Sequence, residues 1–327
     1  MFSTIYVEQA VVDSPRVQNI IARFPAVPVV CCQRYGEIFN RSAQNFRLQK
    51  KAPALILARK HGKLVLPAPA GYGFEGGASY YFSHMLNCLY DCRYCFLQGM
   101  YRSANYVLFV NYEDFTEQLH SSIQGSAGPS IYYSGYDCDS LALEPVTGFC
   151  EYFMPLFRSN PAATLELRTK STQVRYLLQN EPMANCVVAM SFSAEETAQR
   201  WERGVPSMDK RIEALQKLQR AGWPVAIRFE PIIASANTFE QHKQLFERVF
   251  ASLDVAKIHS VSTGEFRVPA DYYKKMVQLY PDQELFARAM ISSDGIMSLR
   301  DNDVETMHKI EQQLLGFISP TQYYRCA

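Results

Sequence analysis

The residues of this sequence with the most evident chemistry are three closely spaced cysteines. Residues 88–95 read Cys-Leu-Tyr-Asp-Cys-Arg-Tyr-Cys, a C-x₃-C-x₂-C spacing. Three thiolates on one short loop can bind three irons of a cubane cluster and leave the fourth iron without a protein ligand. A cluster with an open iron can bind a small molecule in addition to carrying electrons. Cys88, Cys92 and Cys95 are therefore predicted to hold a 4Fe–4S cluster.

Zinc is the alternative interpretation of the same three cysteines. Zinc accepts sites made of three cysteines and one histidine, and His84 is close enough in sequence to be the fourth ligand. The paired C-x₂-C knuckles typical of structural zinc sites are missing from the chain, which favours the iron–sulfur interpretation.

With Tyr94 at its aromatic position, the motif C-x₃-C-x-(aromatic)-C resembles the signature of the radical S-adenosylmethionine (SAM) superfamily. The resemblance implies that the open iron chelates the amino and carboxylate groups of SAM. It also implies that electron transfer splits SAM into methionine and a 5′-deoxyadenosyl radical. A 4Fe–4S cluster and SAM are thus the expected cofactors.

A wider resemblance, from about residue 50 to the C-terminus, is to the spore photoproduct lyase family. Four segments carry it: Cys88–Gln98, Cys138–Thr147, Leu167–Lys170 and Trp201–Gly204. Members of that family return a UV lesion of DNA, 5-thyminyl-5,6-dihydrothymine, to two thymines. The resemblance implies that the adenosyl radical removes a hydrogen from C6 of the lesion. The bond between the bases then breaks, and a cysteine thiol donates a hydrogen atom to the product radical.

The same resemblance assigns roles to individual side chains. Cys138 stands where the family has its hydrogen donor; the alternative is a small buried apolar residue, as free cysteine often is. Tyr94 resembles a tyrosine that relays the hydrogen atom between the thiol and SAM, or it packs against the adenine. Ser140, Lys170 and Ser191 are similar to SAM contacts, and the ammonium of Lys170 could pair with the SAM carboxylate or simply end a strand in solvent. The remaining cysteines are expected to be structural: Cys31, Cys32, Cys150, Cys186 and Cys326.

Three features depart from the family pattern. Phe96 stands where the lyases have a second tyrosine of the radical relay, and it has no phenolic hydrogen. Gly135-Tyr136 stands where many radical SAM enzymes have an acidic residue for the SAM amine, a role that Asp137 could take. Asp294-Gly295 predicts a tight hairpin, but its flanks are apolar where the lyases have basic and aromatic residues. Such a hairpin could wedge between bases or fold onto the barrel.

The elements that must position these residues follow a repeated strand–helix pattern. Runs typical of strands alternate with amphipathic runs such as Tyr112–Gln124 and Met208–Ala221. This alternation predicts an α/β fold, a partial (β/α) barrel whose chemistry lies at the C-terminal ends of its strands. The first 75 or so residues, rich in proline, are expected to be irregular. The expected strands are Ser79–His84, Tyr106–Asn111, Ser130–Tyr136, Thr164–Thr169, Cys186–Phe192, Val225–Ile232 and Lys257–Thr263.

We predict three regions: residues 1–75 as an N-terminal segment packed on the barrel, 76–270 as the radical SAM barrel, and 271–327 as a hairpin and helix that close the substrate side. That closing helix is expected at Asn302–Ile318. The N-terminus does not resemble a signal peptide, and no apolar run is long enough to cross a membrane. Nine cysteines, an odd number with three of them clustered, fit a reducing cytoplasm.

Charge does not indicate a nucleic-acid partner, because 33 basic and 32 acidic side chains give a net charge of +1. The best local basic footprint is Arg47–Lys63, with six lysines or arginines and no acid. It could contact phosphates, or it could be a solvated edge strand.

The favoured hypothesis is a monomeric cytoplasmic radical SAM lyase that repairs UV-damaged DNA and receives electrons from a donor such as ferredoxin or flavodoxin. One alternative is an enzyme of the same family that acts on another damaged or modified base, a nucleoside-derived metabolite or RNA. A second alternative is a non-catalytic zinc or iron–sulfur protein that binds nucleic acid.

Overall fold

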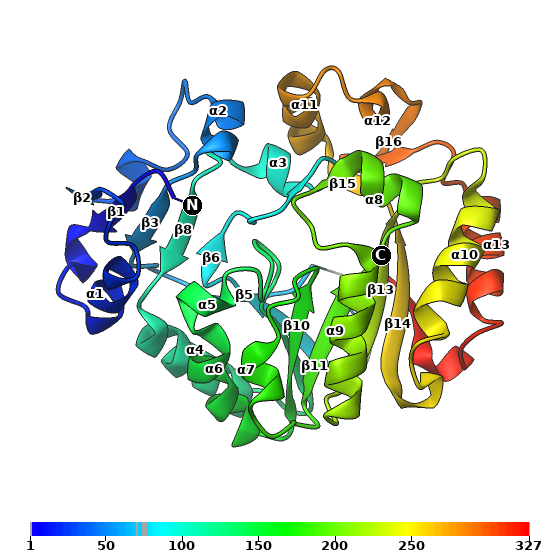
Figure 1. The fold of residues 1–327 in the computed structure, drawn as a ribbon, viewed down its shortest axis with the longest axis horizontal. Helices are drawn as coiled ribbons and strands as arrows, with labels where there is room; N and C mark the ends of the chain where they lie inside the picture. The colour runs from blue at the N-terminus through cyan, green and yellow to red at the C-terminus, as the bar shows by residue number, and fades with distance from the viewer. Residues whose placement is uncertain (1, 70, 74–76, 327) are drawn as a thin grey trace.

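The computed structural model describes residues 2–69, 71–73 and 77–326, and within them the largest sheet has eight strands. The sheet curls around a central axis (Figure 1), and all neighbouring strands are parallel except β4 and β5. Strands of this kind are covered on both faces, which explains why β11 is buried along its whole length. The predicted α/β fold with a partial (β/α) barrel is confirmed. From edge to edge the strands are β18 (Tyr323–Arg325), β14 (Ile258–Glu265), β13 (Val225–Ile232), β11 (Cys186–Ser191), β10 (Ala163–Thr169), β9 (Ser130–Tyr133), β5 (Ala78–Phe82) and β4 (Val65–Pro67).

The helices between these strands cover the outer face of the sheet (Figure 1). In α9 the buried residues include Met208, Ile212, Leu215 and Leu218, the apolar positions whose spacing predicted a helix. The helices of this layer are α4 (Tyr112–Gln124), α6 (Phe149–Arg158), α7 (Arg175–Leu178), α9 (Met208–Arg220) and α10 (Thr238–Phe250), with the shorter α5 (Glu144–Thr147) and α8 (Glu195–Trp201) in the connections.

The N-terminal region forms a second, five-stranded sheet, so the expectation of an irregular first 75 residues was wrong. Its order is β2 (Val29–Cys32), β1 (Ile5–Glu8), β3 (Leu55–Ala58), β8 (Tyr106–Phe109) and β6 (Met85–Leu86). The prolines flank elements, as Pro15 does at the first turn of α1 (Pro15–Ala22). The expected barrel strand Tyr106–Asn111 was also misplaced, because β8 pairs with β3 and β6. A fully buried apolar strand fits either sheet, and its sequence does not specify the partner.

A small layer lies over the C-terminal ends of the barrel strands, opposite α2 (Phe46–Lys51) in Figure 1. The predicted hairpin is confirmed as β16 (Met290–Ser293) and β17 (Ile296–Leu299), with positive φ at both turn residues. β15 (Arg267–Pro269) extends it to three strands, and α11 (Ala270–Leu279) packs beside it. α12 (Glu284–Ala287) contacts α11 through the rings of Phe286 and Tyr273. Gly99 in α3 (Leu97–Met100) lets α11 approach closely, because a Cβ there would lie 2.2 Å from the carbonyl oxygen of Tyr272.

The expected closing helix differs in place. α13 (Val304–Leu314) packs against α10, because its apolar side (Met307, Ile310 and Leu314) belongs to the main core. Of the predicted hairpin and closing helix, the hairpin is the element that lies over the ends of the barrel strands (Figure 1). The region boundaries at residues 75 and 270 stay a prediction. No described helix is long and apolar enough to span a membrane. The remaining elements are the antiparallel pair β7 (Asp91–Cys92) and β12 (Glu202–Arg203) and the 3-10 helices Gln9–Val11, Tyr35–Glu37, Val255–Lys257 and Pro320–Gln322.

Candidate active site

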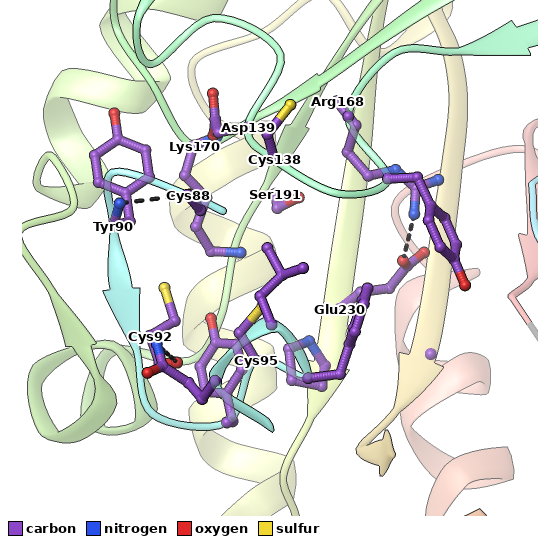
Figure 2. A pocket seen from close by; sticks show the side chains of 18 of the residues that line it. Cys88, Tyr90, Cys92, Cys95, Cys138, Asp139, Arg168, Lys170, Ser191 and Glu230 are labelled. Carbon is purple, nitrogen blue, oxygen red and sulfur yellow. Dashed lines mark hydrogen bonds and ion pairs between the residues drawn. The ribbon is translucent and has the colours of Figure 1, made fainter. Parts of the chain in front are cut away.

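A cavity of about 310 Å³ opens at the C-terminal ends of the barrel strands. The ends of β9, β10, β11, β13 and β14 all contribute to its wall, as expected where parallel strands finish on one rim. Of the predicted site residues, the cavity is lined by Tyr94 and, as Figure 2 shows, by Cys88, Cys92, Cys95, Cys138, Lys170 and Ser191. The structure therefore brings together residues that are up to 103 positions apart in the chain.

The cysteine loop follows β5 and β6 and is held by contacts on both sides. Asn87 has a left-handed backbone with φ of 69° and its side chain donates to the carbonyls of Ser103 and Asn105. The loop then pairs with a distant segment, where Cys92 lies opposite Glu202 in the β7–β12 ladder. These contacts present the three thiols to the same cavity.

The donor set fits a cubane cluster better than a single ion. All three cysteines are free thiols, yet within the described residues no three ligand-type side chains converge closely enough to hold one metal ion. A cubane does not require that convergence, because each thiolate binds a different iron. His84, the fourth ligand of the zinc interpretation, lies away from the cavity. Its buried ring packs 4.4 Å from that of Phe149, and burial lowers its pKa to about 3.

Cys138 lies on the loop after β9, and the carboxylate of Asp139 fixes that loop. Asp139 accepts hydrogen bonds from the hydroxyl of Thr169 at 2.6 Å and the amide of Lys170 at 2.7 Å. Two more come from the loop amides of Leu141 and Ala142. The loop of β9 is thereby tied to the end of β10. The Cys138 thiol is buried, and burial raises its pKa well above the ordinary value, so it is protonated at neutral pH.

The three predicted SAM contacts differ in their surroundings. Lys170 and Ser191 line the cavity from the ends of β10 and β11. Ser140 is buried behind the wall, where its hydroxyl lies 2.8 Å from that of Ser134. Its amide donates to the carbonyl of Arg168, so Ser140 supports the Cys138 loop. A SAM contact stays a prediction for all three.

Tyr94 is buried, and its hydroxyl donates a short hydrogen bond to Glu202. Glu202 also accepts from Ser193 at 2.9 Å, pairs with Arg211 at 3.0 Å and lies 3.8 Å from the ammonium of Lys170. Burial alone would raise the pKa of Glu202, but the charges of Lys170 and Arg211 outweigh it and hold the pKa below its ordinary value. Glu202 therefore stays ionised and sets the position of Tyr94 and Lys170.

The opposite wall of the cavity contains a network of charges. Arg168 pairs with Glu166 at 2.9 Å and with Glu230 at 3.0 Å, and the second of these pairs is visible in Figure 2. Arg228 pairs with the other oxygen of Glu166 at 2.8 Å, and both side chains are fully buried. The guanidinium of Arg168 also lies over the ring of Tyr72. This network holds Arg168 rigidly in the cavity wall.

Sequence reasoning missed several of these residues. Asp139, Arg168 and Glu202 lie inside the segments that carry the family resemblance, so a signal for them existed. Lys50 lines the cavity from α2; it belongs to the basic segment Arg47–Lys63, but that pattern indicated phosphate contacts or a solvated strand and not this cavity. Cys326, expected to be structural, also lines the cavity, because β18 adds to the edge of the barrel and brings the C-terminus to its rim.

The departures from the family pattern also have places in the structure. Phe96 lines the cavity, with its ring 5.7 Å from that of Tyr136. Asp137 is buried and faces a separate hollow beside Lys60 and Tyr101, so it does not supply the missing acidic group to the cavity. In the hairpin, Met290 and Met297 pack against a small apolar cluster, which corresponds to a hairpin folded onto the barrel.

The family model and the curated relatives that match this chain all carry the name spore photoproduct lyase. The family model described as spore photoproduct lyase matches residues 62–283. The spore photoproduct lyase of Bacillus subtilis (strain 168) is 24% identical over 266 residues, which cover 79% of this chain and 75% of that protein. The spore photoproduct lyase of Geobacillus sp. (strain Y412MC61) is 23% identical over 206 residues, or 61% of this chain and 59% of that protein.

Solved structures share the fold. A spore photoproduct lyase complexed with dinucleoside spore photoproduct superposes with a TM-score of 0.85 and 16% identity, covering 99% of both chains. A variant of such a lyase with bound AdoMet and dinucleoside spore photoproduct also gives a TM-score of 0.85 and 16% identity, covering 100% of this chain and 98% of that one.

Proposed function

The chain belongs to the spore photoproduct lyase family, and from that premise we propose that it is a radical SAM lyase that repairs 5-thyminyl-5,6-dihydrothymine in DNA. One observation carries the proposal: the three cysteines of the motif and the buried thiol of Cys138 line the same cavity. The curated relatives that the chain matches are themselves named spore photoproduct lyases, and both solved structures described above hold the dinucleoside photoproduct. The cavity volume lies at the lower end of the range for ligand sites.

The residues present fit both cofactors. Cys88, Cys92 and Cys95 would hold the 4Fe–4S cluster, and Lys170 and Ser191 would contact SAM, with the ammonium of Lys170 opposite the SAM carboxylate. When bound, the cluster and SAM would supply the one-electron chemistry that produces a 5′-deoxyadenosyl radical. The chain contributes position, because Glu202 holds Lys170 and Tyr94 in the cavity wall.

Cys138 is the hydrogen donor of this proposal. Its S–H bond is intact at neutral pH because burial disfavours the thiolate. The carbonyl oxygen of Ser134 lies 3.8 Å from its sulfur and orients the thiol, and Asp139 keeps the loop in place. After the bond between the two bases has broken, the thiol would donate a hydrogen atom to the product radical, so that a C–H bond forms, the S–H bond breaks and the unpaired electron is left on the sulfur of Cys138.

We also propose a cytoplasmic monomer that receives its electrons from a donor such as ferredoxin or flavodoxin. Support comes from the cysteines, since all nine are free thiols and a reducing compartment keeps them so. The cluster must be reduced before it can cleave SAM, and a ferredoxin or flavodoxin would supply that electron in the cell.

The test uses anaerobically reconstituted protein with SAM, dithionite and a dinucleotide that carries the photoproduct. We expect the parent and Cys31→Ala, which changes an exposed cysteine, to release repaired thymine dinucleotide. Cys138→Ala should form 5′-deoxyadenosine but little repaired product, because no thiol remains to quench the product radical. If the parent forms 5′-deoxyadenosine without repair, the substrate in this proposal is wrong.

A different substrate within the same family is the second candidate, and two observations favour it. Phe96 places a phenyl ring in the cavity wall, and the hairpin uses its methionines for internal packing. Equilibrium binding to UV-irradiated and unirradiated strands separates the candidates. A repair enzyme should prefer the irradiated strand, and equal affinity for both strands would favour the other substrate.

A further inference from the structure

One lysine from the N-terminal sheet region reaches the cysteine loop. Lys50, the fifth residue of α2, is partly buried and lines the same cavity as the three cysteines. Its ammonium donates to the backbone carbonyl of Cys88 at 3.1 Å and to that of Tyr90 at 3.3 Å. Both carbonyls lie between the first and second cysteines of the motif.

The helix that carries Lys50 is itself fixed in place. Asn45 caps its N-terminus by accepting from the amide of Leu48, and the ring of Phe46 is buried. The side-chain oxygen of Gln49 accepts from the amide of Ala104 at 2.9 Å. Lys50 is therefore presented from a rigid support and is not a free surface lysine. The next residue, Lys51, is exposed.

Lys50 contacts the segment of the loop that lies between two anchored parts. Asn87 is anchored by its own side chain, and β7 begins only at Asp91. The ammonium bridges two carbonyls of the segment between these anchors, and charge-assisted hydrogen bonds are stronger than neutral ones. Removing them should let this segment open more often.

The charge has a second consequence. Reduction potentials of iron–sulfur clusters depend on the nearby net charge, on hydrogen bonds and on solvent exposure. An ammonium within hydrogen-bonding distance of a cysteine carbonyl, in a partly buried site, is screened only weakly by water. Adding one electron to a cluster beside it is more favourable than beside a neutral side chain.

We propose that Lys50 is a positioning residue for the cysteine loop and that its charge raises the reduction potential of the bound cluster. This inference rests on the proposed function for the cluster itself. Lys50 lies outside residues 62–283, the part of the chain that the family model matches, so the family comparison does not assign it. It links the N-terminal sheet region to the chemistry of the barrel.

The first measurement is the midpoint potential of the reconstituted cluster, from a redox titration followed by electron paramagnetic resonance without substrate. Lys50→Met removes the charge, Lys50→Arg keeps it, and Lys51→Met is the matched control on the same helix. We expect Lys50→Met to lower the equilibrium constant for one-electron reduction about tenfold, which corresponds to about 59 mV. Lys50→Arg and Lys51→Met should stay close to the parent. Equal potentials in Lys50→Met and Lys51→Met would overturn the role of the charge.

The second measurement needs no cluster. In the cluster-free protein, the backbone amides of residues 89–91 should exchange hydrogen for deuterium roughly tenfold faster in Lys50→Met than in Lys51→Met, because the loop opens more often. Equal rates would overturn the positioning role. The two proposals fail separately: a parent that holds a cluster but repairs no lesion contradicts the proposed function alone. A parent that holds no cluster contradicts both the proposed function and the raised potential, and the exchange measurement then still decides the positioning role.

Discussion

Glu166 is the carboxylate on which the charged wall of the cavity depends. Its side chain is fully buried and pairs with Arg228 through one oxygen and with Arg168 through the other. The substitution Glu166→Gln keeps the volume but leaves two arginines with Glu230 as their one remaining anionic partner in this network. We therefore expect a large loss of stability and a displaced Arg168.

The size of the loss follows from two separate arguments. Burial alone would raise the pKa of Glu166, but the charges of Arg228 and Arg168 lower it from 4.5 to about 2. A shift of this size corresponds to about 3 kcal/mol of stability at neutral pH. Breaking a buried ion pair by removing one partner costs about 3–5 kcal/mol. Glu166→Gln should therefore lower the free energy of unfolding by about 3 kcal/mol or somewhat more.

The pH dependence has a defined sign. Because the folded pKa lies below the unfolded one, the contribution of Glu166 is complete at neutral pH and is lost as the pH falls from about 4.5 toward 2. The difference between the parent and Glu166→Gln should therefore shrink by about 1 kcal/mol between pH 7 and pH 4.

The assay is urea unfolding of the cluster-free protein at pH 7 and pH 4. Glu247→Gln, on the exposed face of α10, is the control and should change the free energy of unfolding by less than about 0.5 kcal/mol. A loss below about 1 kcal/mol in Glu166→Gln at pH 7 would refute the reasoning, because surface ion pairs contribute that much. A difference that grows toward pH 4 would also refute it.

Two further substitutions test the region of the Cys138 loop, one its close packing and the other a buried carboxyl group. In Gly135→Ala the new Cβ would lie 2.7 Å from the hydroxyl of Ser140 and 2.8 Å from the carbonyl of Arg168. We expect the free energy of unfolding, measured by thermal unfolding, to fall by about 1–3 kcal/mol and SAM binding to weaken. An unchanged melting temperature would contradict the close approach. Burial raises the pKa of Glu144 to about 7, so the folded protein keeps a proton that the unfolded chain releases above 4.5. The free energy of unfolding should fall by up to about 3 kcal/mol as the pH rises from 4.5 to 7, and Glu144→Gln should remove that slope. A slope that persists in the variant would assign it to other groups.

Local chemistry is what the sequence by itself determined about this protein. The spacing of Cys88, Cys92 and Cys95 indicates a ligand loop, because ligands this close in sequence lie on one loop whatever the rest of the fold does. The sequence Asp294-Gly295 also predicts the hairpin by itself, since few residues accept positive φ at both turn positions. The alternation of strand and helix predicted the barrel because each βα unit can cover only one side of a parallel sheet.

The tertiary structure alone decided which distant residues contact the cysteine loop. Lys50 reaches the carbonyls of Cys88 and Tyr90 from a separate sheet region, and Glu202 meets Tyr94 across 108 positions of the chain. The buried strand β8 joined the N-terminal sheet although its apolar pattern suits either sheet. Periodicity shows that a segment is buried, but its partner depends on the packing of the whole chain. A single charged side chain likewise carries no local signal of the backbone it will contact.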